Sequence, residues 1–203
     1  MFKTFRSVFA PDEGLVVVSG DSRSGNVELD SLLTLYGGAS FKQGLYRILR
    51  ADTVARWGQC VCAAFPKFKG RLTCFGVDWL GRVFALDSGR LVEGEPGVVM
   101  LEPGTGEALE IPCGIVSFHE VELIDYREEA LAESFHAQWR STGGSPPLIT
   151  QCVGYKRPLF LGGSDTIDNL ELTSLDVYWE LARQLLEQTR GVPIGTVVDN
   201  ITI

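Results

Sequence analysis

The sequence predicts an α+β fold, in which an antiparallel or mixed central sheet is flanked by helices and a small C-terminal strand-strand-helix unit packs against it. Two apolar runs with a period of two, 71–79 and 83–87, flank a short connection and predict a β-hairpin. The runs 97–101 and 108–111 flank a Pro-Gly-Thr-Gly turn and predict a second hairpin. Segments with helical periodicity precede and follow both hairpins, which makes the class mixed.

Two short elements and a strand are predicted before residue 51. Phe2, Phe5 and Phe9 recur at helical spacing and indicate a helix that ends before Pro11. Residues 19–26 are polar and glycine-rich and predict a loop. Asp30 is the expected cap of a helix over 31–36, which Gly37-Gly38 ends, and residues 44–50 are the expected strand.

A longer helix precedes the hairpins, and a long helical segment follows them. The helix before the hairpins is expected to be capped by Asp52 and to end at Pro66. Its apolar face is Val54, Trp57, Val61 and Phe65. Ser117 and Glu120 match the capping box that starts many helices. A mostly helical segment is therefore predicted over 118–140, with Leu131, Phe135 and Trp139 on one face.

Residues 142–147 form the most linker-like stretch of the chain and suggest two units. We expect an N-terminal α+β domain over 1–141 and a C-terminal domain over 148–203, which share one core or a large interface. The second unit is predicted as a strand over 157–162, a strand over 169–172 and a helix capped by Thr173 or Ser174. Gly191 is its expected end, and its inner stripe is Leu175, Tyr178, Ala182, Leu185 and Leu186.

Charge is distributed unevenly along the chain. The formal net charge is -8, from 18 basic and 26 acidic residues. Residues 1–90 carry 12 basic and 8 acidic side chains (net +4), and residues 91–203 carry 6 and 18 (net -12). This balance disfavours nucleic acid or an anionic membrane as a partner and favours a basic one. The alternative is an acidic face that only keeps the protein soluble.

Compartment and cofactors are predicted from what the sequence lacks. The chain has no apolar run long enough for a signal peptide or a membrane span, so a cytoplasmic location is expected. Its length of 203 residues needs no disulfide, and five cysteines are expected to be reduced and mostly buried. Cys60 and Cys62 point to different faces of a predicted helix, which disfavours a zinc site there. Glu133 and His136 have the spacing of one ligand pair of a di-iron site, but the sequence lacks the second Glu-x-x-His that such a site needs. No metal or other cofactor is therefore expected.

The sequence contains no complete match to the catalytic motifs with which we compared it. Residues 20–25 resemble a nucleophile elbow, but Ser24 stands where that motif needs glycine, and no dinucleotide or P-loop motif is complete. Asp78, Asp165 and Asp168 are the carboxylates that could be poised for acid-base work. The structural alternative is that Asp78 pairs with Arg82 while the other two form turns, and His136 with Glu133 forms a solvated helix surface. No catalytic residue is predicted.

An acidic cluster is the strongest candidate for a binding surface. Six acids lie between residues 120 and 133 against one base, Arg127, and they cannot all neutralise one another. Such a cluster would steer a basic partner to the surface. The candidate partner-binding residues are Glu120, Glu122, Asp125, Glu128, Glu129 and Glu133.

The C-terminal sequence resembles a known family. The string 153–163 (VGYKRPLFLGG), followed by Asn169-Leu170-Glu171 and the Tyr178-Trp179 helix, is similar to the C-terminal domain of the type VI secretion DNase-immunity family. The pieces 36–38, 44–47 and 75–82 resemble its GAD-like N-terminal part, and the Tyr-Gly-Gly element is more loosely similar to the SUKH immunity superfamily. The signature residues, expected to be structural, are Gly154, Tyr155, Pro158, Leu159, Phe160, Gly162, Gly163, Asn169, Tyr178 and Trp179.

The resemblance implies a cytoplasmic antitoxin that binds and blocks a secreted toxin, and it supplies no catalytic residue. We expect that toxin to be a basic nuclease domain. Two other classes remain open from the residues alone: a non-catalytic regulatory or scaffold protein, and a small hydrolase-type enzyme. An enzyme would need Asp78, Asp165 or a cysteine in a deep polar cleft. The oligomeric state stays open.

Overall fold

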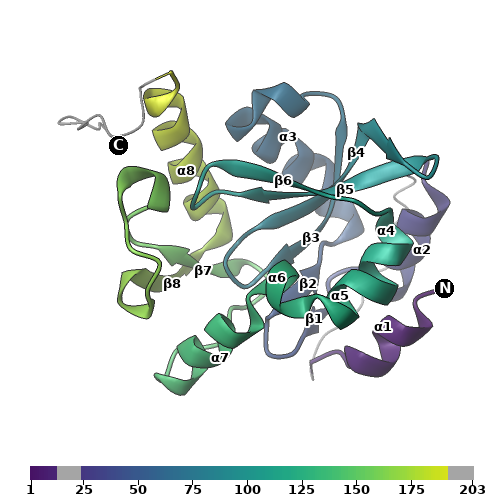
Figure 1. Cartoon of the computed structure of the whole chain (residues 1–203), viewed down its shortest axis with the longest axis horizontal. Helices are drawn as coiled ribbons and strands as arrows, with labels where there is room; N and C mark the ends of the chain where they lie inside the picture. The colour runs from purple at the N-terminus through teal and green to yellow at the C-terminus, as the bar shows by residue number, and fades with distance from the viewer. Residues whose placement is uncertain (13–23, 192–203) are drawn as a thin grey trace.

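Six antiparallel strands form the central sheet of the computed structural model, which describes residues 1–12 and 24–191 (Figure 1). They are ordered β1-β2-β3-β4-β5-β6, so each strand pairs with the next along the chain. A separate two-stranded sheet joins β7 and β8. The strands are β1 (Ser40–Phe41), β2 (Tyr46–Ile48), β3 (Leu72–Asp78), β4 (Val83–Val92), β5 (Glu95–Glu102), β6 (Glu107–Ile111), β7 (Gln151–Tyr155) and β8 (Leu170–Ser174). The α+β prediction and both predicted hairpins are confirmed.

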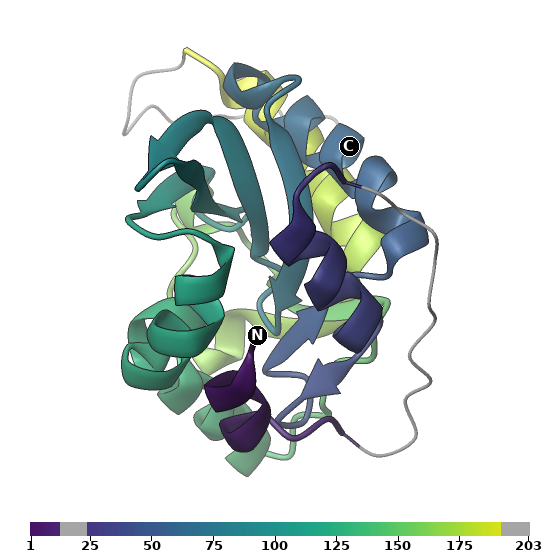
Figure 2. The ribbon, with the colours of Figure 1, turned by 90° about the vertical axis from the view of Figure 1, so that its right-hand side faces the viewer.

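Helices cover both faces of the six-stranded sheet. In Figure 2, α3 and α8 lie to the right of the strands and the run of residues 115–131 lies to the left. The helices are α1 (Lys3–Val8), α2 (Val27–Tyr36), α3 (Val54–Ala64), α4 (Ile115–Ser117), α5 (Leu123–Asp125), α6 (Arg127–Leu131), α7 (Glu133–Ser141) and α8 (Leu175–Thr189). Short single turns are η1 (Ala51–Thr53), η2 (Pro66–Phe68), η3 (Phe118–Glu122), η4 (Leu159–Leu161) and η5 (Ile167–Asn169).

Each face of the sheet has its own apolar core. One core is aromatic, and in it Phe5, Phe41, Tyr46, Phe84 and Phe118 pack mostly edge to face. The other lies under α3 and α8, where Trp57 and Trp179 meet at 6.4 Å between ring centroids. Both cores contain residues from before and after the predicted linker at 142–147, because Val153 and Leu170 join the first and Cys152 and Trp179 the second.

Several N-terminal predictions hold and two caps were wrong. Phe2, Phe5 and Phe9 are buried around α1, and the apolar face of α3 is buried as predicted. However, α2 begins four residues earlier than expected, because the Asn26 side chain accepts a hydrogen bond from Leu29 N at 2.8 Å. Asp52 caps nothing and instead pairs with Arg50 at 2.8 Å. The loop expected at 19–26 lies partly outside the described residues, as does the elbow-like stretch 20–25.

The capping box expected at Ser117 was also wrong. Helical structure already begins at Ile115, and Ser117 makes no side-chain cap. Glu120 reaches α1 instead, where its Oε2 accepts a hydrogen bond from Thr4 N at 3.1 Å. The expected long helix is broken by the π-turn η3 and by Ala132, whose φ is +50°.

In the C-terminal unit, the first strand was misplaced. The signature string contributes Val153, Gly154 and Tyr155 to β7, whereas residues 157–162, predicted as a strand, form a tight turn around η4. Pro158 explains the shift, because it has no N–H to donate to a ladder. The second strand and α8 lie close to where they were expected, and Gly191 follows α8 with φ +80°.

Candidate functional site

The turn between β3 and β4 joins three parts of the molecule. Asp78 is fully buried, and its Oδ2 pairs with Arg82 Nε at 2.5 Å, which is the structural alternative that the sequence offered. From the same turn, Trp79 Nε1 donates to Leu131 O at 2.9 Å and Arg82 Nη2 donates to Ala130 O at 3.1 Å. These bonds satisfy the last carbonyls of α6 and fix the start of α7 against the sheet.

The C-terminal unit is attached to this same turn. Val153 N donates to Trp79 O at 2.7 Å, and Trp179 Nε1 donates to Gly81 O at 2.9 Å. Arg47 on β2 is fully buried and donates to the Asp78 carbonyl at 2.5 Å, to the Leu148 carbonyl and to the Gln151 carbonyl. Burial lowers the pKa of Arg47 to about 10, so its guanidinium remains charged at neutral pH.

The signature residues serve this attachment. Tyr178 Oη accepts a hydrogen bond from Tyr155 N at 3.3 Å, and a Cβ on Gly154 would lie 2.7 Å from the Tyr178 ring. Asn169 Nδ2 donates to Arg157 O at 2.9 Å and thereby closes the turn that contains Pro158, Gly162 and Gly163. Leu159 and Phe160, only partly buried, donate their backbone N–H groups to Gly104 O in the β5–β6 turn. We therefore retain a structural role for the signature residues.

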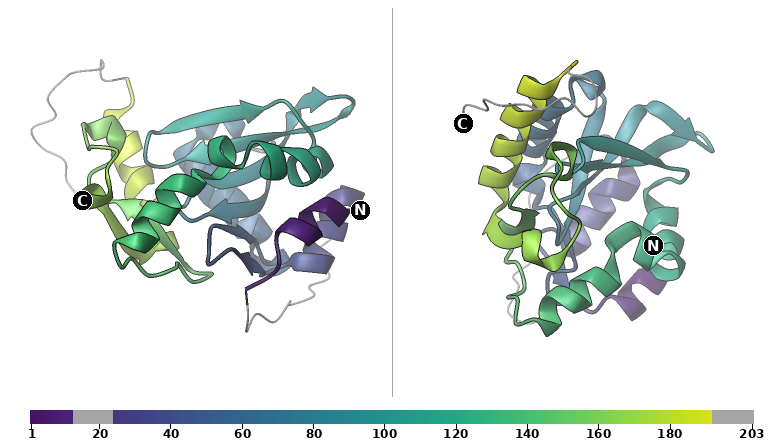
Figure 3. Two further views of the ribbon diagram at one scale, coloured as in Figure 1. Left: turned by 60° about the horizontal axis from the view of Figure 1, so that its bottom comes forward. Right: turned by 60° about the vertical axis from the view of Figure 1, so that its left-hand side comes forward.

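Residues 115–133 form a second, irregular region on the opposite face of the sheet. Figure 3 shows α1 beside this run, and Thr4 N bonded to Glu120 fixes the contact. Partial burial alone would raise the pKa of Glu120, but the hydrogen bonds from the start of α1 hold it below its ordinary value. Here the chain uses one acid of the predicted cluster to dock its first helix.

The structure divides the six predicted acids into two groups. Three of them have partners inside the protein: Glu120 at α1, Glu128 with Ser134 N at 2.8 Å, and Glu133 with Arg127 at 2.7 Å and Lys42 at 3.8 Å. The side chains of the other three, Glu122, Asp125 and Glu129, have neither ion pair nor hydrogen bond among residues 1–12 and 24–191; Asp125 and Glu129 are exposed and Glu122 is half-buried. We call these three the free acids, and they are the part of the cluster available to a partner.

Sequence reasoning missed one side chain in this region, Tyr126. Its side chain is 52% exposed and it follows Asp125 directly, at the break between α5 and α6. Helical periodicity assigned no role to this tyrosine, because it lies off the apolar stripe of the predicted helix. An aromatic residue off that stripe and among acids was the available signal.

The two histidines are buried rather than solvated, which corrects the expectation for His136. His119 lies within an aromatic cage, and its ring nitrogens face Tyr46 Oη at 3.0 Å and Ile115 O at 2.8 Å. His136 is 6% exposed and packs against Trp79 with ring centroids 5.2 Å apart. Burial lowers the pKa of each histidine to about 4, so both are neutral at pH 7 and neither faces a cysteine or a cleft.

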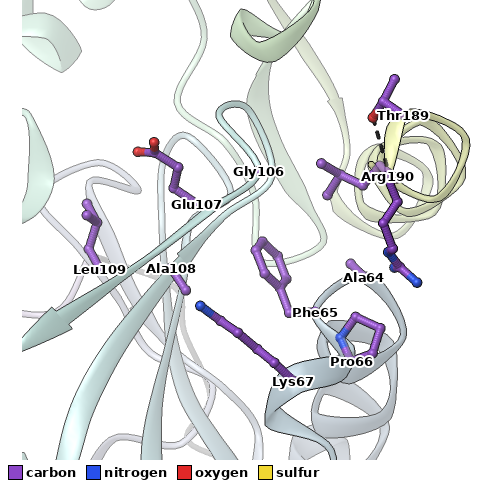
Figure 4. Close-up of a pocket in the computed structure, with 11 residues that line it drawn as sticks. Ala64, Phe65, Pro66, Lys67, Gly106, Glu107, Ala108, Leu109, Thr189 and Arg190 are labelled. Atoms are coloured by element: carbon purple, nitrogen blue, oxygen red, sulfur yellow. Dashed lines mark hydrogen bonds between the residues drawn. The ribbon is translucent and has the colours of Figure 1, made fainter. Parts of the chain in front are cut away.

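An open cleft of about 820 Å³ lies between the end of α3, β6 and the end of α8 (Figure 4). Lys67 extends from the α3 side towards Ala108 on β6, and Arg190 lies on the α8 side. Glu107 is the acid in its lining, and neither a histidine nor a cysteine lines it. This arrangement places no nucleophile beside a base.

The residues that would favour an enzyme lie elsewhere. Asp78 is sealed in its ion pair, and Asp165 is exposed and accepts a hydrogen bond from Tyr155 Oη at 2.7 Å. Cys62 borders a mostly apolar groove beside α3, and burial raises the pKa of its thiol, which makes it a weaker nucleophile. In the described part of the chain, no group of three or more His, Cys, Asp or Glu side chains could hold a metal ion.

The signature turn and the acids from Glu122 to Glu133 lie in a segment that matches a known family. Residues 122–186 match the family model described as the C-terminal region of the type VI secretion (T6SS) immunity protein Tdi1. These residues are therefore similar to a T6SS immunity-protein domain. The resemblance seen in the sequence is thereby confirmed for the C-terminal region. The matched segment runs from just before α5 into α8, so it contains Asp125, Tyr126 and Glu129 as well as the signature turn.

Comparison with solved structures supports the fold over nearly the whole chain. The crystal structure of Atu4351 from Agrobacterium tumefaciens superposes with a TM-score of 0.61 at 15% identity, covering 91% of this chain and 89% of that one. At this identity the likeness concerns the fold alone. No curated protein matches the chain. Among the described residues, no helix is both long and apolar enough to cross a membrane.

Proposed function

We propose that this protein is an immunity protein that binds and neutralises a cognate secreted toxin in the cytoplasm of the cell that makes both. The observation that carries the proposal is the match of residues 122–186 to the T6SS immunity family. The two clefts beside α3 fit it, because neither places a nucleophile beside a base. Inhibition by stoichiometric binding requires neither.

We further propose that the toxin presents a basic surface and is a nuclease. Nucleases bind phosphates through Lys and Arg, so their substrate channels are complementary to an acidic partner. The free acids supply such a surface, since Arg127, the one base in this stretch, already pairs with Glu133. The second half of the chain, with a net charge of -12, gives the same sign over a wider area.

Co-expression with the secreted effector encoded beside this gene tests the proposal. The expected result is that the protein rescues cells from the effector and co-purifies with it in a stoichiometric complex. An effector that stays toxic and does not co-purify would contradict the proposal. Measuring DNA and RNA degradation in unrescued cells tests the nuclease assignment separately.

A matched pair of variants tests the role of the free acids. Reversal of all three (Glu122→Lys, Asp125→Lys, Glu129→Lys) is expected to weaken rescue. The control reverses three exposed acids outside the cluster that have no ion pair in the described residues: Glu107→Lys, Asp168→Lys and Glu171→Lys. Equal rescue by the two variants would remove the free acids from the binding surface.

A further inference from the structure

Tyr126 differs from every other tyrosine of the chain. Tyr36, Tyr46, Tyr155 and Tyr178 are buried, whereas Tyr126 is 52% exposed. Its hydroxyl has no hydrogen-bond partner among the residues that the structure describes. A tyrosine that neither packs in a core nor bonds through its hydroxyl gains little from folding, so the folded protein alone does not account for its position.

The backbone holds Tyr126 among the free acids. Its φ and ψ of -119° and 36° interrupt the helix, yet its N–H still donates to Glu122 O at 3.0 Å and its carbonyl still accepts from Ala130 N at 2.9 Å. Helical spacing therefore persists on both sides, with Glu122 one turn before and Glu129 one turn after. Asp125 is its direct neighbour in the chain, so three acids without an ion pair in the described residues lie within four positions of one exposed tyrosine.

The only base of this stretch is turned away from that ring. Arg127 Nε lies 2.7 Å from Glu133 Oε2, and its guanidinium lies over Phe9 at 5.9 Å from the ring centroid. Arg127 therefore contributes to packing against α1 and leaves the free acids uncompensated. In the described residues, none of the free acids near Tyr126 has a cation within ion-pair distance.

This pattern corresponds to a binding hot spot. Hot spots are enriched in tyrosine, lie near the centre of an interface and are surrounded by polar contacts that exclude water. Exposed charges mainly set the rate of association, while a buried aromatic anchor mainly sets the rate of dissociation. The two kinds of residue here can therefore be separated by kinetics.

Resting on the proposed function, we infer that Tyr126 is the anchor of the toxin-binding surface and that its ring enters an apolar socket bordered by Lys or Arg on the toxin. A second copy of this chain is a poorer occupant. A symmetric contact centred on Tyr126 would bring the free acids of both copies together and repel.

Binding kinetics with the purified, catalytically inactivated toxic domain of the adjacent effector test the inference. The variants are Tyr126→Ala, Tyr126→Phe and, as a control, Val177→Ala, which truncates a similarly exposed side chain (51%) on α8. We expect Tyr126→Ala to raise the dissociation rate about 30-fold, the usual range for a hot-spot truncation. Its association rate, salt dependence and thermal unfolding midpoint should stay unchanged.

The other variants and outcomes complete the test. Tyr126→Phe should bind like the unaltered protein, because the hydroxyl has no partner to lose, and Val177→Ala should also bind normally. A dissociation rate unaffected by Tyr126→Ala, with toxin still neutralised, would overturn the anchor while leaving the proposed function intact. Absence of any binding by the unaltered protein would overturn both. A self-association that Tyr126→Ala abolishes would overturn the toxin as occupant in favour of a second copy.

Discussion

The turn at residues 78–82 and the run at 115–133 use charge in opposite ways. In the turn, Asp78 and Arg82 are buried and paired with each other, and Trp79 and Arg82 donate hydrogen bonds to the end of α6. In the run, Glu122, Asp125 and Glu129 remain without partners among residues 1–12 and 24–191, and Tyr126 is exposed between them. Buried, neutralised charge holds the two halves together, whereas uncompensated charge is left for a partner. Variants in the two regions should therefore affect different properties.

The largest loss of stability is expected from Asp78→Asn. The change keeps the shape but removes the anion, and it leaves the Arg82 guanidinium buried without a counter-charge. Breaking a buried ion pair in this way costs about 3–5 kcal/mol. Urea unfolding of the variant and of the unaltered protein measures the difference. A loss below about 1 kcal/mol, the scale of an exposed pair, would mean that the pair contributes little.

Acid should destabilise the protein through its two buried histidines. His119 and His136 have a pKa of about 4 when folded and about 6.5 when unfolded, so the unfolded chain binds protons first. Their contribution to the free energy of unfolding is complete above pH 6.5 and is lost as the pH falls towards 4. At pH 5 the loss is about 2 kcal/mol for each histidine. Unfolding free energies measured at pH 7 and 5 check this.

The variant His119→Gln isolates one of the two histidines. It cannot take up the proton, so the difference in unfolding free energy between pH 7 and 5 should shrink by about half. An undiminished difference would show that His119 does not titrate in this range.

A smaller effect is expected from the signature turn. A Cβ on Gly163 would lie 1.9 Å from the Arg157 carbonyl oxygen, and backbone cannot move aside as a side chain can. Gly163→Ala should cost about 1–3 kcal/mol. Gly162→Ala is the matched control: its nearest neighbour is 3.6 Å away and its φ is +77°, so it should cost about 1 kcal/mol from backbone strain alone. Thermal unfolding of both variants ranks them, and equal losses would contradict the close contact.

The smallest effect on stability is expected from reversing the free acids. None of the three has a partner in the described residues, so the triple lysine variant should unfold within about 0.5 kcal/mol of the unaltered protein. Circular dichroism melts check this. A loss of several kcal/mol would show that the run is architectural, like the turn.

The fold was predictable where the hydrophobic periodicity and the turn residues of the sequence indicated the same element boundaries. The hairpins around Gly81 and residues 103–106 join apolar-rich runs through glycine-containing turns, and both were found where expected. Predictions failed where a distant partner decided the local structure. Ser117 and Glu120 match a capping box, but α1 offers Thr4 N to Glu120, and no local pattern encodes that contact. The sequence predicts a strand over 157–162, yet the missing N–H of Pro158 suits the turn that Asn169 closes.

The candidate surface was predictable in charge and not in detail. The sequence indicates six acids against one base, but only the packing of α1 and α7 shows that Glu120, Glu128 and Glu133 are occupied inside the protein. Tyr126 lies off the apolar stripe of the predicted helix, which was a signal for exposure, but the sequence does not show that its hydroxyl lacks a partner in the described residues.

The most direct test of the separation between architecture and binding is the association rate with the inactivated toxic domain, measured from low to physiological salt. The unaltered protein should associate quickly at low salt and slow steeply as salt rises. The triple variant Glu122→Lys, Asp125→Lys, Glu129→Lys should associate slowly, with a flat or inverted salt dependence, while remaining fully folded. A triple variant that keeps both the rate and the salt dependence of the unaltered protein would contradict this account.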